Sequence, residues 1–287
     1  MIRPVDILAF GAHPDDVELS CGGTLLVANA QGQSTGIVDL TYGELGTRGN
    51  KESRLRESTK AREILGVTFR ANLGLSDGFI DDSMESKLAV IRAIRSARPQ
   101  IVLANAVKDR HPDHPQAAKL VREAAFLSGL VKIETRDDQG NVQQAHRPKA
   151  VYHYIQSDYI EPSFVVNISD FWDKKWEAIM AYSTQFHSIN TKDKAFDNSD
   201  KKTFISTPTF LEMLKGRHAE FGNLIGANYA EGFVSNRPVG LQNILSLSWV
   251  ADEMKLLKED ALQRPSGMQR VMSWATFGAT AYLSLQG

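Results

Sequence analysis

The stretch VDILAFGAHPDDVELSCGG, residues 5–23, decides the fold. It begins with an apolar run over 5–10 that is typical of a buried strand, and a helical pattern follows over 22–31. Between the two, the chain places His13 just before two adjacent aspartates. Neighbouring carboxylates that are taken out of water repel each other unless a cation compensates them. The stretch therefore predicts a metal ion at the end of the first strand.

Short β-branched runs alternate with longer helical patterns along the rest of the chain. The strand-like runs lie at 36–41, 71–75, 100–106, 150–155 and 164–168, and the helix-like segments at 51–66, 86–98, 171–182 and 209–224. This alternation predicts an α/β fold, a Rossmann-like and mostly parallel sheet with helices on both faces. In such sheets ligands bind beyond the carboxyl ends of the strands.

The sequence shows no linker that divides its first part, so we expect one domain over 1–245 and a separate C-terminal extension over 246–287. The extension carries an amphipathic stripe that predicts a helix packed on the domain or on a neighbouring subunit: Leu247, Val250, Met254, Leu257 and Ala261. The polar stretch at 187–202 is expected to be a surface excursion and a candidate lid.

The composition is that of a soluble globular protein. The 287 residues are 42% hydrophobic, and 33 basic against 34 acidic residues leave a net charge of −1, so neither nucleic acid nor a membrane is an expected partner. The single cysteine, Cys21, excludes an internal disulfide and fits a reducing compartment. No signal-like or membrane-spanning run is read in the sequence, so we expect a cytoplasmic protein.

A second charged motif, DRHPDH at 109–114, follows the predicted strand over 100–106. Because parallel strands end at one edge of the sheet, both motifs are expected to converge there. His13, Asp16 and His114 then form the set of three protein ligands that is typical of a catalytic zinc, with water in the fourth position. The same donor set also fits Fe(II).

The remaining polar residues of the two motifs suggest catalytic roles. Asp15 would accept a proton from a metal-activated water, and His111 would act as the acid or stabilise the oxyanion. Asp109, two residues before His111, would orient its imidazole. A single motif of this kind is usually a solvated surface feature, but two motifs at strand ends of one sheet favour a metal site. Cys21 is interpreted as a small buried residue rather than as a nucleophile.

Several segments of the chain resemble one known family: AHPDD followed by HPDH, and more extensively ILAFGAHPDDVELSCGGT, GIVDLTYGELGTRG, NLGLSDGF, RPKAVYHYIQ and NYAEGF. These motifs are similar to those of the PIG-L/LmbE-like superfamily of metal-dependent N-acetylglucosaminide deacetylases. Within it, the chain resembles the branch that acts in bacillithiol biosynthesis, which removes acetate from N-acetyl-glucosaminyl-malate.

The resemblance implies a role for each matching residue. It places the metal ligands on His13, Asp16 and His114, the general base on Asp15, and the second catalytic histidine with its carboxylate partner on His111 and Asp109. It also implies a substrate-binding arginine at Arg54, with Arg48 and Arg110 as further candidates for a malyl carboxylate, because guanidinium binds carboxylate in a bidentate manner. A homo-oligomer, a trimer or a hexamer, is implied as well.

One residue departs from the family pattern, because Phe210 stands where some relatives carry a tyrosine near the catalytic pocket. His111 would then carry more of the work of stabilising the oxyanion. Two other functions stay open on the sequence alone. One is deacetylation of another N-acetylglucosamine conjugate, and the other is a non-catalytic module that binds a sugar or a nucleotide, for which a water-activating base is unnecessary.

Overall fold

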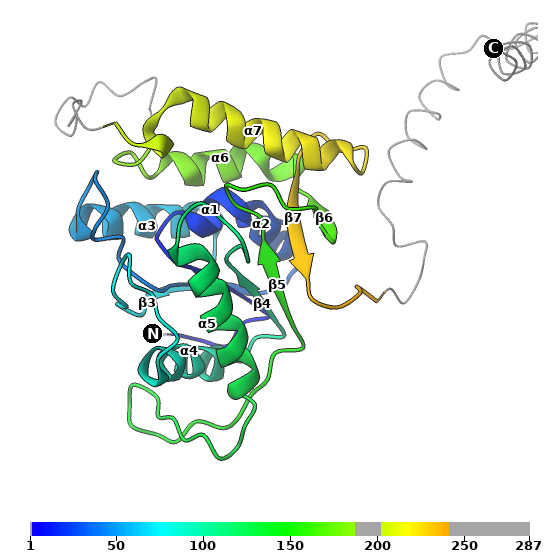
Figure 1. The fold of residues 1–287 in the computed structure, drawn as a ribbon. Helices are drawn as coiled ribbons and strands as arrows, with labels where there is room; N and C mark the ends of the chain where they lie inside the picture. The colour runs from blue at the N-terminus through cyan, green and yellow to red at the C-terminus, as the bar shows by residue number, and fades with distance from the viewer. Residues whose placement is uncertain (1, 187–201, 241–287) are drawn as a thin grey trace, which may run out of the picture. The chain divides into compact units, whose positions relative to one another are not determined.

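The computed structural model describes residues 2–186 and 202–240 (Figure 1). The predicted extension over 246–287 lies outside the described residues, and so does the predicted lid except for residue 202. None of the helices in the described part of the chain is long and apolar enough to cross a membrane.

A seven-stranded sheet forms the centre of the fold, in the order β3-β2-β1-β4-β5-β7-β6. The five strands from β3 to β5 run parallel, and β7 is antiparallel to both of its neighbours. The strands are β1 (Ile7–Gly11), β2 (Thr35–Asp39), β3 (Phe69–Asn72), β4 (Ile101–Ala104), β5 (Ala150–Tyr154), β6 (Phe164–Asn167) and β7 (Ala230–Ser235). The prediction of an α/β fold with a mostly parallel sheet is confirmed.

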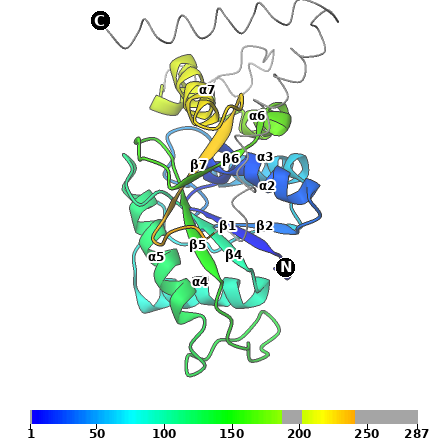
Figure 2. The same ribbon diagram turned by 90° about the vertical axis from the view of Figure 1, so that its right-hand side faces the viewer.

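Helices cover both faces of this sheet (Figures 1 and 2). α4 and α5 lie on one face, and α1, α2, α3 and α6 lie on the other, with α7 next to α6 and β7. The helices are α1 (Asp16–Ser20), α2 (Gly22–Ala30), α3 (Lys51–Leu65), α4 (Met84–Ala97), α5 (Asp113–Leu127), α6 (Trp172–Met180) and α7 (Pro208–Asn223), with single 3-10 turns η1 (Ser169–Phe171) and η3 (Phe204–Ser206).

The apolar run of β1 is buried on both sides. Leu8 and Phe10 belong to the core under α4 and α5, whereas Ile7 and Ala9 belong to the core under α2. All four are buried, because successive side chains of a strand point to opposite faces and both faces are covered here. β1 is the middle one of the five parallel strands, so the polar turn that follows it lies between the ends of its neighbours β2 and β4.

Local signals explain where α3 begins and ends. The side chain of Asn50 accepts a hydrogen bond from the backbone N–H of Ser53, and the hydroxyl of Ser53 accepts one from the backbone N–H of Asn50. Gly66 ends the helix with a φ of 67°, a left-handed conformation that glycine adopts without a steric penalty.

The structure contains three elements that the sequence did not predict: α1, α5 and β7. α5 begins inside the second charged motif, and Pro115 in its first turn is compatible with a helix because that turn has no intrahelical N–H partners to lose. The family-like segment YAEGF, residues 229–233, forms most of β7, whose pairing with both β5 and β6 is long-range.

Candidate metal and active site

The turn after β1 brings the first motif to the sheet edge. Gly11 is required there, because a Cβ at this position would lie 2.9 Å from the carbonyl oxygen of His13. Asp15 adopts a φ of 118°, a left-handed conformation that costs a non-glycine residue conformational energy. α1 begins at the next residue, Asp16. The strained turn therefore separates the directions of the two adjacent carboxylates.

Two amides that the sequence analysis missed connect the first motif to neighbouring strand ends. Asn105, just after β4, accepts a hydrogen bond from the backbone N–H of Ala12 at 2.9 Å and donates one to Oδ2 of Asp16 at 3.0 Å. Gln156, just after β5, donates to Oδ1 of Asp16 at 3.0 Å. A polar residue directly after a buried strand is the signal that could have identified both. The two amides fix the orientation of the Asp16 carboxylate.

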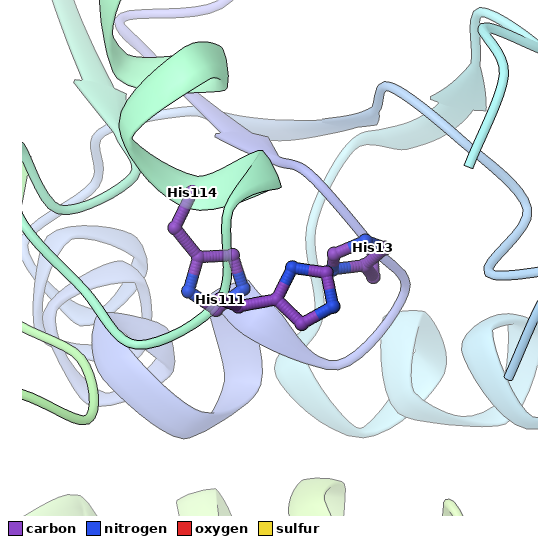
Figure 3. A group of neighbouring side chains, drawn as sticks. All are labelled: His13, His111 and His114. Atoms are coloured by element: carbon purple, nitrogen blue, oxygen red, sulfur yellow. The ribbon is translucent and has the colours of Figure 1, made fainter. Parts of the chain in front are cut away.

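Three imidazole rings from the two motifs, those of His13, His111 and His114, lie next to one another (Figure 3). The ring centroids of His13 and His111 are 4.6 Å apart, those of His111 and His114 are 5.0 Å apart, and those of His13 and His114 are 5.5 Å apart. One nitrogen of each ring lies within 4.8 Å of a nitrogen of the other two, which is close enough to share a metal ion. The structure thus brings together side chains about one hundred residues apart in sequence.

His114 has one nitrogen for a metal and one for a supporting carboxylate. Its Nδ1 lies 2.9 Å from Oδ1 of Asp109, and its Nε2 lies 3.2 Å from Oδ1 of Asp16. Histidines that bind metals almost always donate their second N–H to a carboxylate or a carbonyl, which fixes the tautomer. With Nδ1 bound to Asp109, it is Nε2 that faces Asp16 and would bind a metal ion.

His13 is arranged like His114, except that its Nε2 faces the supporting carboxylates and its Nδ1 faces Asp16. Its Nε2 lies 3.1 Å from both Asp77 and Asp113, and its Nδ1 lies 3.6 Å from Oδ2 of Asp16. Burial lowers the pKa of His13, but hydrogen bonds to Asp113, Asp16 and Asp77 outweigh it and raise that pKa well above its ordinary value. This crowding of carboxylates favours a positive charge at the site, which a metal cation would supply.

The residues at this position fit a divalent metal ion. His13 and His114 each turn one nitrogen toward the oriented carboxylate of Asp16, and carboxylates support their outer nitrogens. His111 is close enough to be a further donor, and His13 also forms a group with Asp77 and Asp113. Imidazole and carboxylate together suit zinc, iron and related transition metals.

Asp109 does not have the role that its spacing suggested. Its carboxylate contacts the ring of His114, whereas His111 donates only its backbone N–H to Asp109, at 3.1 Å. The prediction that Asp109 orients the His111 imidazole is therefore wrong. The turn at the start of α5 brings His114 rather than His111 over Asp109. Nδ1 of His111 instead accepts the backbone N–H of Asp113 at 3.3 Å, which leaves Nε2 to carry the proton.

The protonation states of His111 and Asp15 follow from their surroundings. Burial and the neighbouring rings of His13 and His114 lower the pKa of His111, which favours its neutral form. Burial raises the pKa of Asp15 to about 6, although Arg54 opposes this shift. A carboxyl with a pKa near neutrality can both accept and return a proton at physiological pH.

Arg54 is hydrogen-bonded to Asp15 and to the turn that carries it. Its Nη1 donates to Oδ2 of Asp15 and to the carbonyl oxygen of Pro14, both at 2.9 Å, and the arginine is 5% exposed. Gly43, with a φ of 66°, makes room for the guanidinium, because a Cβ there would lie 2.8 Å from Nη2. Arg54, which the sequence predicted to bind substrate, is therefore hydrogen-bonded to Asp15, the predicted general base.

A cavity of about 330 Å³ opens over the cluster. Arg110 lines it with its guanidinium 4.4 Å above the ring of Phe204, and the buried Phe210 also lines it. Arg48 does not line the cavity, because its Nε donates to the carbonyl oxygen of Thr184 at 2.8 Å. The structure therefore does not place Arg48 at the cavity with the other predicted residues, and its substrate-binding role stays a prediction. Arg54, which shares the wall with Asp15, lines the cavity too.

Comparisons with known proteins agree with this site. The model of the PIG-L family, described as GlcNAc-PI de-N-acetylase, matches residues 8–125, which include both charged motifs. A crystal structure of a conserved protein from Thermus thermophilus is 38% identical, has a TM-score of 0.73, and is matched over 84% of this chain and 98% of that one.

Three curated relatives carry different activities. The chain is 30% identical to the diacetylchitobiose deacetylase of Thermococcus kodakarensis, over 63% of this chain and 70% of the relative. It is 25% identical to the 4-oxalmesaconate hydratase of Pseudomonas putida, over 63% of this chain and 74% of the relative. It is also 25% identical to a probable N-acetyl-alpha-D-glucosaminyl L-malate deacetylase 2 of Bacillus anthracis, over 66% of this chain and 84% of the relative.

The chain belongs to the PIG-L/LmbE-like family of deacetylases. The resemblance that the sequence motifs suggested is thereby confirmed at the level of the family.

Proposed function

We propose that this protein is a metal-dependent amide hydrolase that removes acetate from N-acetyl-glucosaminyl-malate. Membership of a deacetylase family supports the reaction, and a relative named as a probable deacetylase of this malate glycoside supports the substrate. One observation carries the proposal. Asp15, a carboxyl with a pKa of about 6, lies in the cavity beside a group of imidazoles and carboxylates that fits a metal ion.

The chain supplies the proton transfers of amide hydrolysis. A divalent metal, which we propose to be zinc with Fe(II) as the alternative, would be held by His13, Asp16 and His114 and would supply an activated water and a polarised carbonyl. Asp15 accepts a proton from the water that attacks the acetamide carbonyl. The Nε2–H of His111 then hydrogen-bonds to the oxyanion of the tetrahedral intermediate.

The same carboxyl completes the reaction. As the C–N bond breaks, Asp15 returns its proton to the leaving sugar amine, and acetate and glucosaminyl-malate are the products. A neutral His111 has one N–H to donate and keeps it for the oxyanion, so Asp15 is the better proton donor. Arg54 keeps the Asp15 carboxylate in the cavity throughout. Arg110 is the residue that we assign to a malyl carboxylate.

Release of acetate from three substrates tests the proposal. The zinc-loaded protein would be given N-acetyl-glucosaminyl-malate, free N-acetylglucosamine and N-acetyl-glucosaminyl-inositol, with an Asp15→Ala variant as the control. We expect strong preference for the malyl substrate and near-complete loss of turnover in the variant, with its metal content unchanged. If no acetate is released from any of the three substrates, the proposal that the protein is a deacetylase is refuted.

A second candidate is a deacetylase of another N-acetylglucosamine conjugate, because a relative at 30% identity is a diacetylchitobiose deacetylase. Equal activity on all three substrates would favour it. A non-catalytic sugar- or nucleotide-binding module is the remaining alternative, and a metal-free protein that binds ligand without turnover would support it. A cytoplasmic homo-oligomer, trimeric or hexameric, stays a prediction, which light scattering would test.

A further inference from the structure

Arg217 on α7 is a cavity-lining cation to which the proposed reaction gives no role. The arginines that line the cavity are Arg54, Arg110 and Arg217. Arg54 is bound to Asp15 and is unavailable to a second carboxylate from that side. Arg110 stacks on Phe204, and Arg217 donates a hydrogen bond to a backbone carbonyl.

Arg217 lies at the end of the cavity that borders the metal ligands. Its Nη2 donates to the carbonyl oxygen of Ser157, and the backbone N–H of Ser157 donates to Oδ2 of Asp109 at 2.6 Å. Asp109 in turn supports His114, and Arg110 is the next residue in the chain. Arg110, from the loop before α5, and Arg217, from α7, thus line the same cavity from two different parts of the chain.

The charge of Arg217 is only partly compensated. Burial, the largest influence, lowers its pKa, and the more distant carboxylates of Asp109, Glu220 and Asp158 offset only part of this effect. Among the residues that the structure describes, neither Arg217 nor Arg110 is within 4.0 Å of a carboxylate oxygen. A ligand carboxylate would thus meet two guanidinium groups that do not have to be released from a protein carboxylate.

Apolar side chains of α7 surround this end of the cavity. Phe210, Leu214 and Phe221 are all buried and line it. An apolar wall lowers the local dielectric constant and strengthens a charge-assisted hydrogen bond to a bound anion. A neutral sugar hydroxyl gains much less from the same surroundings.

We propose that Arg217 is a specificity-determining residue that, together with Arg110, binds a carboxylate of the substrate aglycone. The inference rests on the proposed function and narrows its substrate class to glycosides with an anionic aglycone. A dicarboxylate such as malyl matches two separate guanidinium groups, and a neutral aglycone leaves both without a partner. Arg217 is thereby a binding residue and takes no part in the proton transfers.

Steady-state kinetics of Arg217→Met on an acidic and a neutral substrate test this assignment. We expect kcat/KM for N-acetyl-glucosaminyl-malate to fall at least tenfold, mainly through KM, because one charge-assisted hydrogen bond is lost, while kcat/KM for free N-acetylglucosamine changes less than about twofold. Arg217→Lys should recover part of the loss. Lys215→Met, an exposed charge on the same helix, is the matched control and should behave as wild type.

An equal loss on both substrates would overturn the inference, because it would show that Arg217 merely holds Ser157 and Asp109 in place. A variant that is unchanged on both would overturn it as well. A second measurement is independent of turnover: malate should raise the melting temperature of the wild type and of Lys215→Met but not that of Arg217→Met. If the wild type hydrolyses neither substrate, the proposed function fails, and the malate shift alone then decides whether Arg217 binds carboxylates.

Discussion

Removing the charge of Lys175 should cost this protein several kcal/mol of stability. Lys175 on α6 is fully buried, and its ammonium lies 2.6 Å from Oε1 of the equally buried Glu231 on β7. It also donates to the carbonyl oxygens of Glu18 and Leu19, which belong to α1, at 2.8 and 2.9 Å. All three N–H donors of the ammonium therefore have protein acceptors.

The size of the stability loss follows from the buried charge that each variant leaves without its partner. Lys175→Met leaves Glu231 charged and buried, with hydrogen bonds only from the backbone of Gly23 and from the backbone and hydroxyl of Thr24. Breaking a buried pair from one side costs about 3–5 kcal/mol, because the remaining charge loses its partner. Glu231→Gln should cost a similar amount by leaving Lys175 unpaired. The double variant buries neither charge and should cost less than the sum of the two by about 2 kcal/mol.

Urea unfolding measures these differences, followed by far-UV circular dichroism and by tryptophan fluorescence. Trp172 and Trp176, two of the four tryptophans of the chain, lie on α6 close to Lys175, so part of the fluorescence change reports on the helix that carries the lysine. We expect the midpoint of unfolding to move to a lower urea concentration, while the dependence of the unfolding free energy on urea stays unchanged. Additive effects of the two substitutions, or a Lys175→Met variant as stable as wild type, would refute the claim that the pair acts as one buried unit.

Three further predictions concern the site and its surroundings. Asp15→Asn should lower kcat for acetate release by about 10²–10⁴-fold, the range for loss of a general base, with bound metal unchanged by elemental analysis. Asp109→Asn should weaken metal binding about 10–100-fold in a chelator competition, because His114 loses its supporting carboxylate, while an unchanged affinity would argue against that role. Burial lowers the pKa of His218 well below its ordinary value, so the folded state keeps it neutral and the unfolded state binds one more proton below pH ~6.5. The free energy of unfolding should therefore fall as the pH drops below ~6.5. In urea titrations, His218→Gln should make that fall shallower by about 1 kcal/mol per pH unit. The same pH dependence in the variant and the wild type would contradict this assignment.

The parts of the site that could be predicted were those that follow a strand directly. Polar residues after the apolar runs of β1 and β4 can be read from the sequence, and parallel strands bring such ends together. His13, Asp16 and His114 were predicted on this basis, and the structure places them side by side. Asp77 was not predicted as part of the site, because it reaches His13 from a loop after β3 whose path no periodicity indicates.

Asp109 and Arg48 have other contacts than their positions in the sequence suggested, and the cause is the same for both. Spacing along the chain indicates which residues are near each other but not which atom a side chain meets. The start of α5 turns His114 over Asp109, and the loop that carries Arg48 lies against the segment after α6, where Thr184 accepts its N–H. Both outcomes depend on long-range packing, as does β7, which pairs with strands far away in sequence.

The helix that carries Asp16 explains why so many buried charges lie behind the site. α1 has five residues, too few for a helix to be stable by itself, and its first residue must stay fixed between His13 and His114. Tertiary contacts supply that order: Glu18 of α1 is bound by Arg70 and by the hydroxyl of Tyr182, and Lys175 holds the carbonyls of Glu18 and Leu19. Loss of Lys175 should therefore loosen Asp16 as well as the fold, so its variant should bind metal more weakly even under conditions in which it remains folded.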